Sequence, residues 1–182
     1  MQDRSVLLRN ATLVDATWPE PRPGCSVLIE GDVIREVSDR PIASASADAF
    51  DVRGKTLMPG LIDCHVHVVV SMVNIASLAL LPDSVAAFRT VPILRGMLDR
   101  GFTTVRDAGG ADAGLALAVD QDLVAGPRLF VSGKALSQGG GHGDIRGRFD
   151  DAEPRPAGRL GVLSRVVDGV DAVRAAARDE LR

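Results

Sequence analysis

Two histidines, His65 and His67, are separated by one residue in the segment Pro-Gly-Leu-Ile-Asp-Cys-His-Val-His, which begins at Pro59. The apolar and β-branched residues on both sides of the pair predict a buried β-strand. Side chains two positions apart on a strand point to the same face, so the two imidazoles can converge. Imidazole nitrogens are common zinc ligands. An isolated His-x-His pair is weak evidence, but a turn at Pro59-Gly60 that leads the chain into the strand favours a metal site.

Other polar residues can support such a site. Asp63 precedes the histidines and can hydrogen-bond to an imidazole ligand. Asp107 ends a later predicted strand, from which it could reach the site, but we expect it to cap the following turn at Ala108-Gly109. Lys134 follows a third strand, and we expect it at a strand end or on the surface. Three arginines of one polar loop can bind a substrate carboxylate or simply be solvated: Arg146, Arg148 and Arg155.

The elements that must position these residues fall into two parts. Residues 5–57 predict a small β-module of four or five short strands, with a turn at Arg9-Asn10 and a tight hairpin at Glu30-Gly31-Asp32. From Leu61 onward the pattern alternates between strands and helices, which predicts βα units and a parallel sheet. We expect strands at 61–70, 102–106 and 128–132, helices at 83–100, 112–124 and from 168 onward, and a long loop at 138–160.

Composition excludes several classes of protein. The 182 residues are 46% hydrophobic and 25% charged, as in ordinary globular proteins, and the net charge of −3 argues against a nucleic-acid partner. Charged residues interrupt the first twenty positions, and the apolar stretch 66–81 is too short and too polar for a membrane span. Cys25 and Cys64 are expected to be small buried residues rather than a disulfide pair. These features favour the cytoplasm and argue against a membrane partner.

The ordered motifs resemble those of a known family. Residues Pro59 to His67 are similar to the first barrel strand of the metal-dependent amidohydrolase superfamily, and Gly101 to Asp107 are similar to its second. Gly126 to Leu129, followed by Gly139 to Asp144, resemble its third strand and the loop after it. The set is similar to the prolidase-like and imidazolonepropionase-like branch. The resemblance implies a (β/α)8 TIM barrel of which residues 59–182 form the first three βα units, ending before strand four, preceded by part of a β-sandwich at residues 1–58.

The same resemblance implies the chemistry. His65 and His67 match the first two ligands of one or two zinc ions, or of another divalent metal, that activate a water for attack on an amide bond. The glycine-rich loop lies over that site, so His142 would contact the substrate; the alternative is an exposed loop histidine. The substrates implied are dipeptides or N-acyl amino acids, with a cyclic amide or imidazolone as the alternative.

The resemblance also implies a carboxylated lysine on strand four that bridges the metals. Lys134 is a candidate for it, but Lys134 sits on strand three, and a strand-end or surface lysine is the interpretation we favour. The family's other later ligands and its general base are expected beyond Arg182, so the catalytic residue is not assigned. This leaves a second hypothesis, in which the chain is an inactive fragment or a module that depends on a partner for the remaining strands. A small-molecule or peptide substrate is the expected partner, and the full-length protein is expected to be a homo-oligomer.

Overall fold

The computed structural model describes residues 5–150, 152–154 and 158–181. The chain divides into two compact units, Met1–Pro59 and Gly60–Arg182. No helix in the described part of the chain is long and apolar enough to cross a membrane.

The first unit is a five-stranded sheet in the order β3-β2-β1-β4, with β5 also paired to β1. The predicted hairpin is confirmed, because β2 and β3 are antiparallel neighbours joined through Gly31, whose φ of +62° suits a tight turn. The turn expected at Arg9-Asn10 is wrong: β1 continues through a bulge at this point, where Asn10 has a φ of +57° and the pairing register shifts. The strands are β1 (Ser5–Leu13), β2 (Arg22–Glu30), β3 (Val33–Ser38), β4 (Asp48–Asp51) and β5 (Thr56–Leu57).

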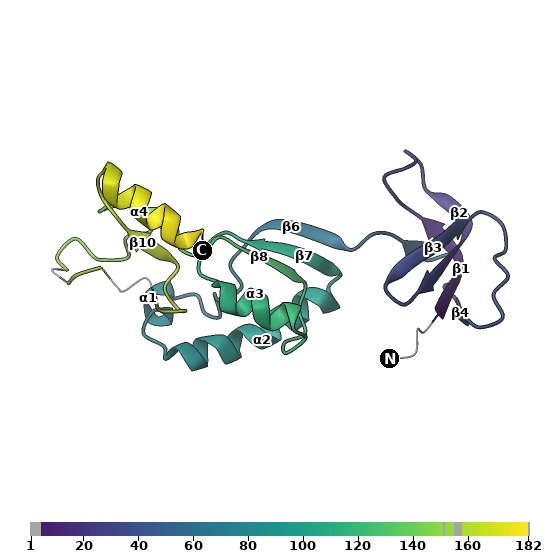
Figure 1. Cartoon of the computed structure of the whole chain (residues 1–182), viewed down its shortest axis with the longest axis horizontal. Helices are drawn as coiled ribbons and strands as arrows, with labels where there is room; N and C mark the ends of the chain where they lie inside the picture. Colours follow the sequence, from purple (N-terminus) through teal and green to yellow (C-terminus); the bar gives the residue numbers. More distant parts are fainter. Residues whose placement is uncertain (1–4, 151, 155–157, 182) are drawn as a thin grey trace. The chain divides into compact units, whose positions relative to one another are not determined.

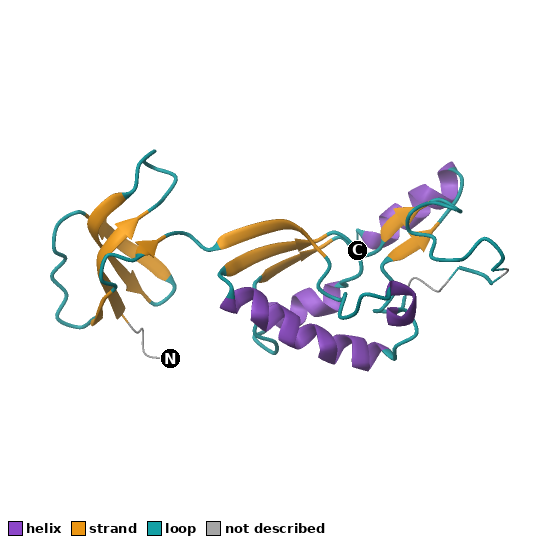
Figure 2. Ribbon diagram, turned by 180° about the vertical axis from the view of Figure 1, so that it is seen from behind, coloured by secondary structure: helices purple, strands orange, loops and turns teal. Residues whose placement is uncertain are grey.

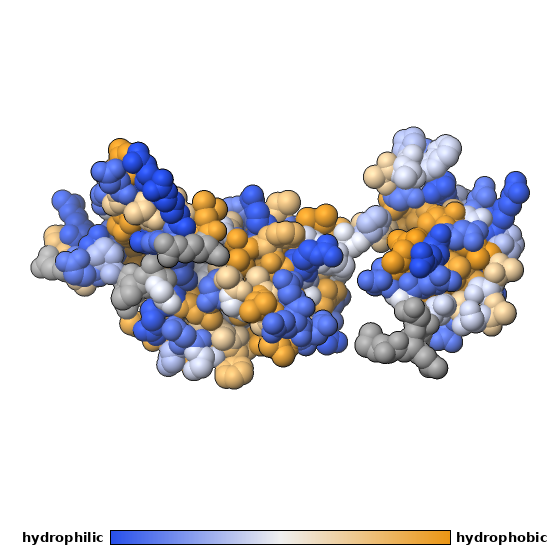
Figure 3. Space-filling view, in the orientation of Figure 1, coloured by the Kyte–Doolittle hydropathy of each residue, from blue (hydrophilic) through white to orange (hydrophobic). Residues whose placement is uncertain are grey.

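Apolar side chains of this first sheet are only partly buried. Leu7 and Cys25 are fully buried, but Ile34 on β3 and Phe50 on β4 are 63% and 49% exposed. Figure 3 shows the resulting apolar surface among the polar residues of this unit. The five strands therefore do not bury their own apolar residues completely.

The second unit is built on a parallel three-stranded sheet in the order β6-β7-β8 (Figure 1). Helices α2 and α3 cover one face of this sheet (Figure 2), and Leu94, Val105 and Leu129 meet in the core between the two layers. The predicted alternation of strand and helix is confirmed for these elements. They are β6 (Leu61–Val66), α2 (Asp83–Asp99), β7 (Phe102–Asp107), α3 (Ala113–Asp120) and β8 (Arg128–Val131).

Four further elements complete this unit. Strands β9 and β10 form a parallel pair that the sequence did not predict, because three residues are too few to establish a strand period. They flank the segment 138–160, whose described residues form no helix or strand, as expected for a long loop. The elements are α1 (Ile75–Leu78), β9 (Ala135–Ser137), β10 (Ser164–Val166) and α4 (Val170–Glu180).

The first strand of this sheet differs from its prediction in three ways. Residues 58–60 enter β6 without a turn, and Gly60 is required there because a Cβ would lie 2.1 Å from the Thr103 hydroxyl oxygen of β7. The strand ends at Val66 rather than at residue 70. Cys64 is exposed, contrary to expectation. The reason is that the described residues leave the sheet face opposite the helices uncovered, where Ile62 and Phe130 are 66% and 56% exposed.

Candidate metal centre

His65 and His67 lie at the carboxyl end of β6, His65 within the strand and His67 one residue beyond it. Their ring centroids are 5.3 Å apart and the rings are nearly perpendicular, at 84°. Both side chains are exposed. Two imidazoles so placed, at the end of a parallel strand where α/β proteins commonly bind ligands, can share one metal ion.

The ring of His67 is oriented by a backbone carbonyl. Its Nδ1 lies 2.9 Å from the carbonyl oxygen of Gly109, in the turn that follows β7. A carbonyl oxygen can only accept a hydrogen bond, so Nδ1 carries the proton and Nε2 is left with its lone pair. Metal-binding histidines are usually held in this way, because the second ring nitrogen fixes both the tautomer and the ring direction.

Asp107 joins the two backbone segments that set this geometry. Its carboxylate is fully buried and accepts three backbone N–H groups: Val68 at 2.7 Å, Gly109 at 3.0 Å and Ala111 at 3.2 Å. Burial raises the pKa of the Asp107 carboxyl, while these N–H groups and His67 act in the opposite direction. The expectation that Asp107 caps the turn is confirmed. The same carboxylate also fixes the residue after His67, so it ties the ligand strand to the carbonyl that orients the ring.

The backbone at His65 is held by different groups. Asp63 accepts the N–H of His65 at 3.0 Å, so its carboxylate shapes the strand and does not hydrogen-bond to an imidazole. Arg106 of β7 donates from Nε to the carbonyl oxygen of Cys64 at 2.7 Å. These two contacts secure the bulged end of β6, where the pairing with β7 shifts register.

His142 lies in the glycine-rich loop between β9 and β10 and is exposed. Within the described residues, its ring makes no hydrogen bond and has no contact with His65 or His67. The backbone beside it is well anchored, because Ser137 Oγ accepts the N–H of Gly143 at 3.0 Å and Ser164 Oγ donates to the carbonyl of the same residue. The loop thus holds the backbone around His142 and leaves the ring to solvent.

The arginines near this loop are largely engaged. Arg146 donates from Nε and a terminal nitrogen to Asp144, at 2.8 and 2.7 Å, and from its other terminal nitrogen to the carbonyl of Ala152. Arg146 therefore has little capacity left for a substrate carboxylate. Arg148 lies 5.9 Å from the ring centroid of Phe149, and Arg155 falls outside the described residues.

Lys134 differs from its prediction. It is only 7% exposed, so it is neither a surface residue nor a solvated strand end. Burial lowers the pKa of its ammonium group, and nearby acidic residues, Asp112 first, oppose that shift. No local sequence pattern indicated this burial, because the segments that contact the side chain, at Gly110 and Arg159, lie far from it along the chain.

The donor set fits part of a metal site. Two imidazoles, one of them with a fixed tautomer, are suitable zinc ligands. Among the described residues, however, no group of three or more histidine, cysteine, aspartate or glutamate side chains could hold a metal ion. A catalytic zinc normally has three protein ligands, and the described residues bring together two candidates, His65 and His67.

Residues 56–182 match the model of the amidohydrolase family, and the chain belongs to that family. The predicted membership of this family is thereby confirmed, and the resemblance to hydrolases supports the expectation of an enzyme.

Three proteins with similar sequences or structures make the comparison more specific. The chain is 33% identical over 185 residues to ochratoxinase from Aspergillus niger, covering 90% of this chain and 37% of that protein. It is 55% identical to an amidohydrolase of known crystal structure, with a TM-score of 0.90, and 52% identical to a prolidase crystallised with N-methylphosphonate-L-proline, with a TM-score of 0.91. Each match covers 97% of this chain and 44% of the relative. The chain therefore spans less than half the length of these proteins.

Proposed function

We propose that this chain supplies the first two metal ligands, His65 and His67, of a prolidase-like hydrolase that cleaves amide bonds in dipeptides or N-acyl amino acids. The observation that supports it most directly is the oriented ring of His67, whose Nδ1 contacts the Gly109 carbonyl oxygen at 2.9 Å. The buried carboxylate of Asp107 fixes both the backbone directly after His67 and the backbone of Gly109. Such support is unexpected for an exposed histidine that has no function. The 52% identity to a prolidase favours this substrate class.

The same proposal includes the architecture. The three βα units are taken as the first part of a (β/α)8 barrel, and the five-stranded sheet as part of a β-sandwich. In the described residues β6 and β8 pair only with β7, so the outer edge of each is open. The uncovered face with Ile62 and Phe130 would then line the barrel interior, which side chains of further strands fill.

In this proposal the residues of the candidate centre and His142 have different roles. His65 and His67 bind the metal, which when present polarises the scissile carbonyl and lowers the pKa of a water molecule. Asp107 and the Gly109 carbonyl hold His67 in one tautomer and one direction. His142, on its anchored loop, contacts the substrate. Zinc is the proposed metal because imidazole suits it, although other divalent ions bind similar ligands.

Hydrolysis assays test the substrate class. The assay uses the full-length protein, which in this proposal supplies the remaining ligands and the general base. After loading with Zn²⁺, it is given dipeptides that end in proline, N-acyl amino acids and, as a distinct class, cyclic amides. We expect hydrolysis of one of the first two classes, abolished by chelation and by His65→Ala or His67→Ala. Activity that persists in both variants would contradict the site, and hydrolysis restricted to cyclic amides would contradict the substrate class.

A second candidate, a module that depends on a partner, is favoured by the open edges of β6 and β8. The remaining strands and ligands would then come from a separate chain. Measurement of the molecular mass and thermal unfolding of the 182-residue chain separates the two. A monomer that unfolds cooperatively and hydrolyses amides on its own would exclude dependence on a partner.

A further inference from the structure

Lys134 is a buried cation to which the proposed chemistry gives no task. Its ammonium forms no ion pair within the described residues, although it is almost completely removed from solvent. Burial of a charge without a close counter-charge is costly, so the ammonium must be satisfied by other groups. The identity of those groups indicates what the residue does.

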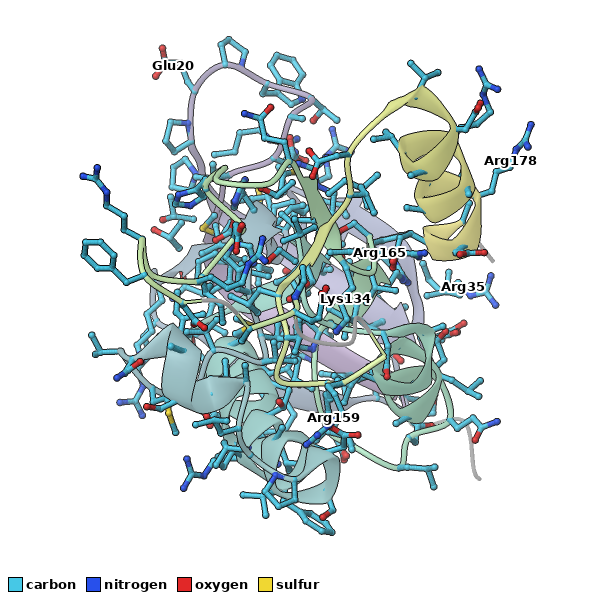
Figure 4. All side chains as sticks on the ribbon, turned by 90° about the vertical axis from the view of Figure 1, so that its left-hand side faces the viewer. Glu20, Arg35, Lys134, Arg159, Arg165 and Arg178 are labelled. Carbon is cyan, nitrogen blue, oxygen red and sulfur yellow. The ribbon has the colours of Figure 1, made fainter. Side chains whose placement is uncertain are left out.

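The side chain and backbone of Lys134 connect three segments that are distant in sequence. Nζ donates to the carbonyl oxygen of Gly110 at 2.8 Å, in the turn after β7, and to that of Arg159 at 3.0 Å. The backbone N–H donates to the Glu180 carboxylate of α4 at 2.8 Å. Figure 4 shows the Lys134 label near the middle of the view, whereas Arg178 projects outward from α4.

One of these contacts leads directly to the metal ligand. Gly110 follows Gly109, whose carbonyl oxygen orients His67. Two adjacent glycines leave this turn with much conformational freedom, and Gly110 has a φ of +117°. Its N–H donates to the carbonyl of Gly133 at 2.9 Å, while its own carbonyl accepts from Lys134. Residues 133 and 134 therefore hold the Gly110 peptide groups on both sides.

We propose that Lys134 is a positioning residue for the metal centre: its ammonium fixes the turn at Gly109-Gly110 and thereby keeps the ring of His67 in the Nδ1–H tautomer. The effect on metal affinity rests on the proposed function. The effect on the tautomer does not, because it concerns the metal-free protein alone. A lysine with only a structural role would alter stability and leave the His67 ring unchanged.

Nuclear magnetic resonance of ¹⁵N-histidine-labelled, metal-free protein measures the tautomer directly. The chain has only three histidines, and His65→Ala and His142→Ala variants assign the signals. At a pH where the rings are neutral, we expect His67 to be the Nδ1–H form in the native chain and a mixture of both tautomers in Lys134→Met. We also expect Zn²⁺ to bind about tenfold more weakly to that variant, the lower end of the effect of losing an outer partner.

Glu180→Ala is the matched control, because it removes the anchor of the Lys134 backbone and leaves the contacts of Nζ in place. It should reduce stability without changing the His67 tautomer. If Lys134→Met does not fold, Lys134→Gln replaces it, and the His67 tautomer and the Zn²⁺ affinity are measured in the same way. An unchanged tautomer in the folded lysine variant, or the same change in Glu180→Ala, would overturn the positioning role. Failure of the native chain to bind Zn²⁺ would count against the proposed function, while the tautomer comparison would still decide the role of Lys134.

Discussion

The turn after β7, residues 107–111, and the glycine-rich loop at residues 137–144 each fix the backbone around a candidate histidine in a different way. In the turn, a buried carboxylate and a backbone carbonyl determine both the path of the chain and the direction of the His67 ring. In the loop, serine hydroxyls fix the backbone at Gly143, and the ring of His142 stays exposed. A metal ligand requires an oriented ring, whereas a histidine that contacts a substrate requires only a fixed backbone.

The acidic residues of the two regions show the same contrast. Asp107 is buried among N–H groups, and burial raises the pKa of its carboxyl. The carboxyl of Asp144 is paired with Arg146, and the hydrogen bonds from that side chain lower its pKa well below the ordinary range. The turn therefore depends on desolvated hydrogen bonds, and the loop depends on an ion pair near solvent. Substitutions in the turn should have the larger effects.

Asp107→Ala should have the largest effect on stability. Three buried N–H groups lose their acceptor, which should lower the free energy of unfolding by roughly 3–5 kcal/mol, the range for breaking a buried charged network. Urea-induced unfolding of the chain measures the change. A loss below about 1 kcal/mol, the size expected for one exposed contact, would remove the proposed difference between turn and loop.

Asp112→Ala is the matched substitution at the next aspartate along the chain. Asp112 caps α3 by accepting the N–H of Leu115 at 2.9 Å, and loss of such a cap costs about 1 kcal/mol. It should change the orientation of His67 less than Asp107→Ala does, because its cap hydrogen bond does not reach Gly109 and its charge acts on Lys134 only at a distance. Unfolding and histidine spectra test both statements. An effect as large as that of Asp107→Ala would mean that any aspartate in this region is equally important.

Ser164→Ala removes the hydroxyl that donates to the Gly143 carbonyl. We expect a loss of about 1 kcal/mol and faster amide hydrogen exchange in the residues next to His142. Metal binding should not change. If exchange in the loop is unaltered, the serine does not anchor the backbone of His142.

The smallest effect should be a pH dependence confined to the loop. Because the folded pKa of Asp144 is lowered, its contribution is present above the ordinary aspartate pKa of about 3.9 and is lost as the pH falls through the lower folded value. The N–H of Gly140, which donates to Asp144 at 3.0 Å, reports this change through its chemical shift. The shift should move only in strong acid, and Asp144→Asn should remove the transition. A transition near pH 4 in the native chain would contradict the ion pair.

Local patterns predicted much of the fold. Short runs of apolar and β-branched residues located β7 and β8, and the Glu30-Gly31-Asp32 signal located the first hairpin. Other features depend on which strands lie next to one another, and a local sequence pattern does not contain that information. They are the early end of β6, the exposure of Cys64 and the short strands β9 and β10.

For the candidate centre, the sequence predicted the candidate ligands and one supporting residue. The spacing of His65 and His67 marked them as candidate ligands, and the position of Asp107 at a strand end predicted a cap. No sequence pattern could predict that the Gly109 carbonyl orients the His67 ring, because every residue has a carbonyl group. The burial of Lys134 was missed because its partners, Gly110 and Arg159, are more than twenty positions away.

A calorimetric titration of the metal-free chain with Zn²⁺ tests most directly whether His65 and His67 bind the same metal ion. The native chain and His142→Ala should bind Zn²⁺ with equal affinity. His65→Ala and His67→Ala should each bind at least about tenfold more weakly, since each removes a ligand rather than an outer partner. Equal Zn²⁺ affinity in all four proteins would contradict the account.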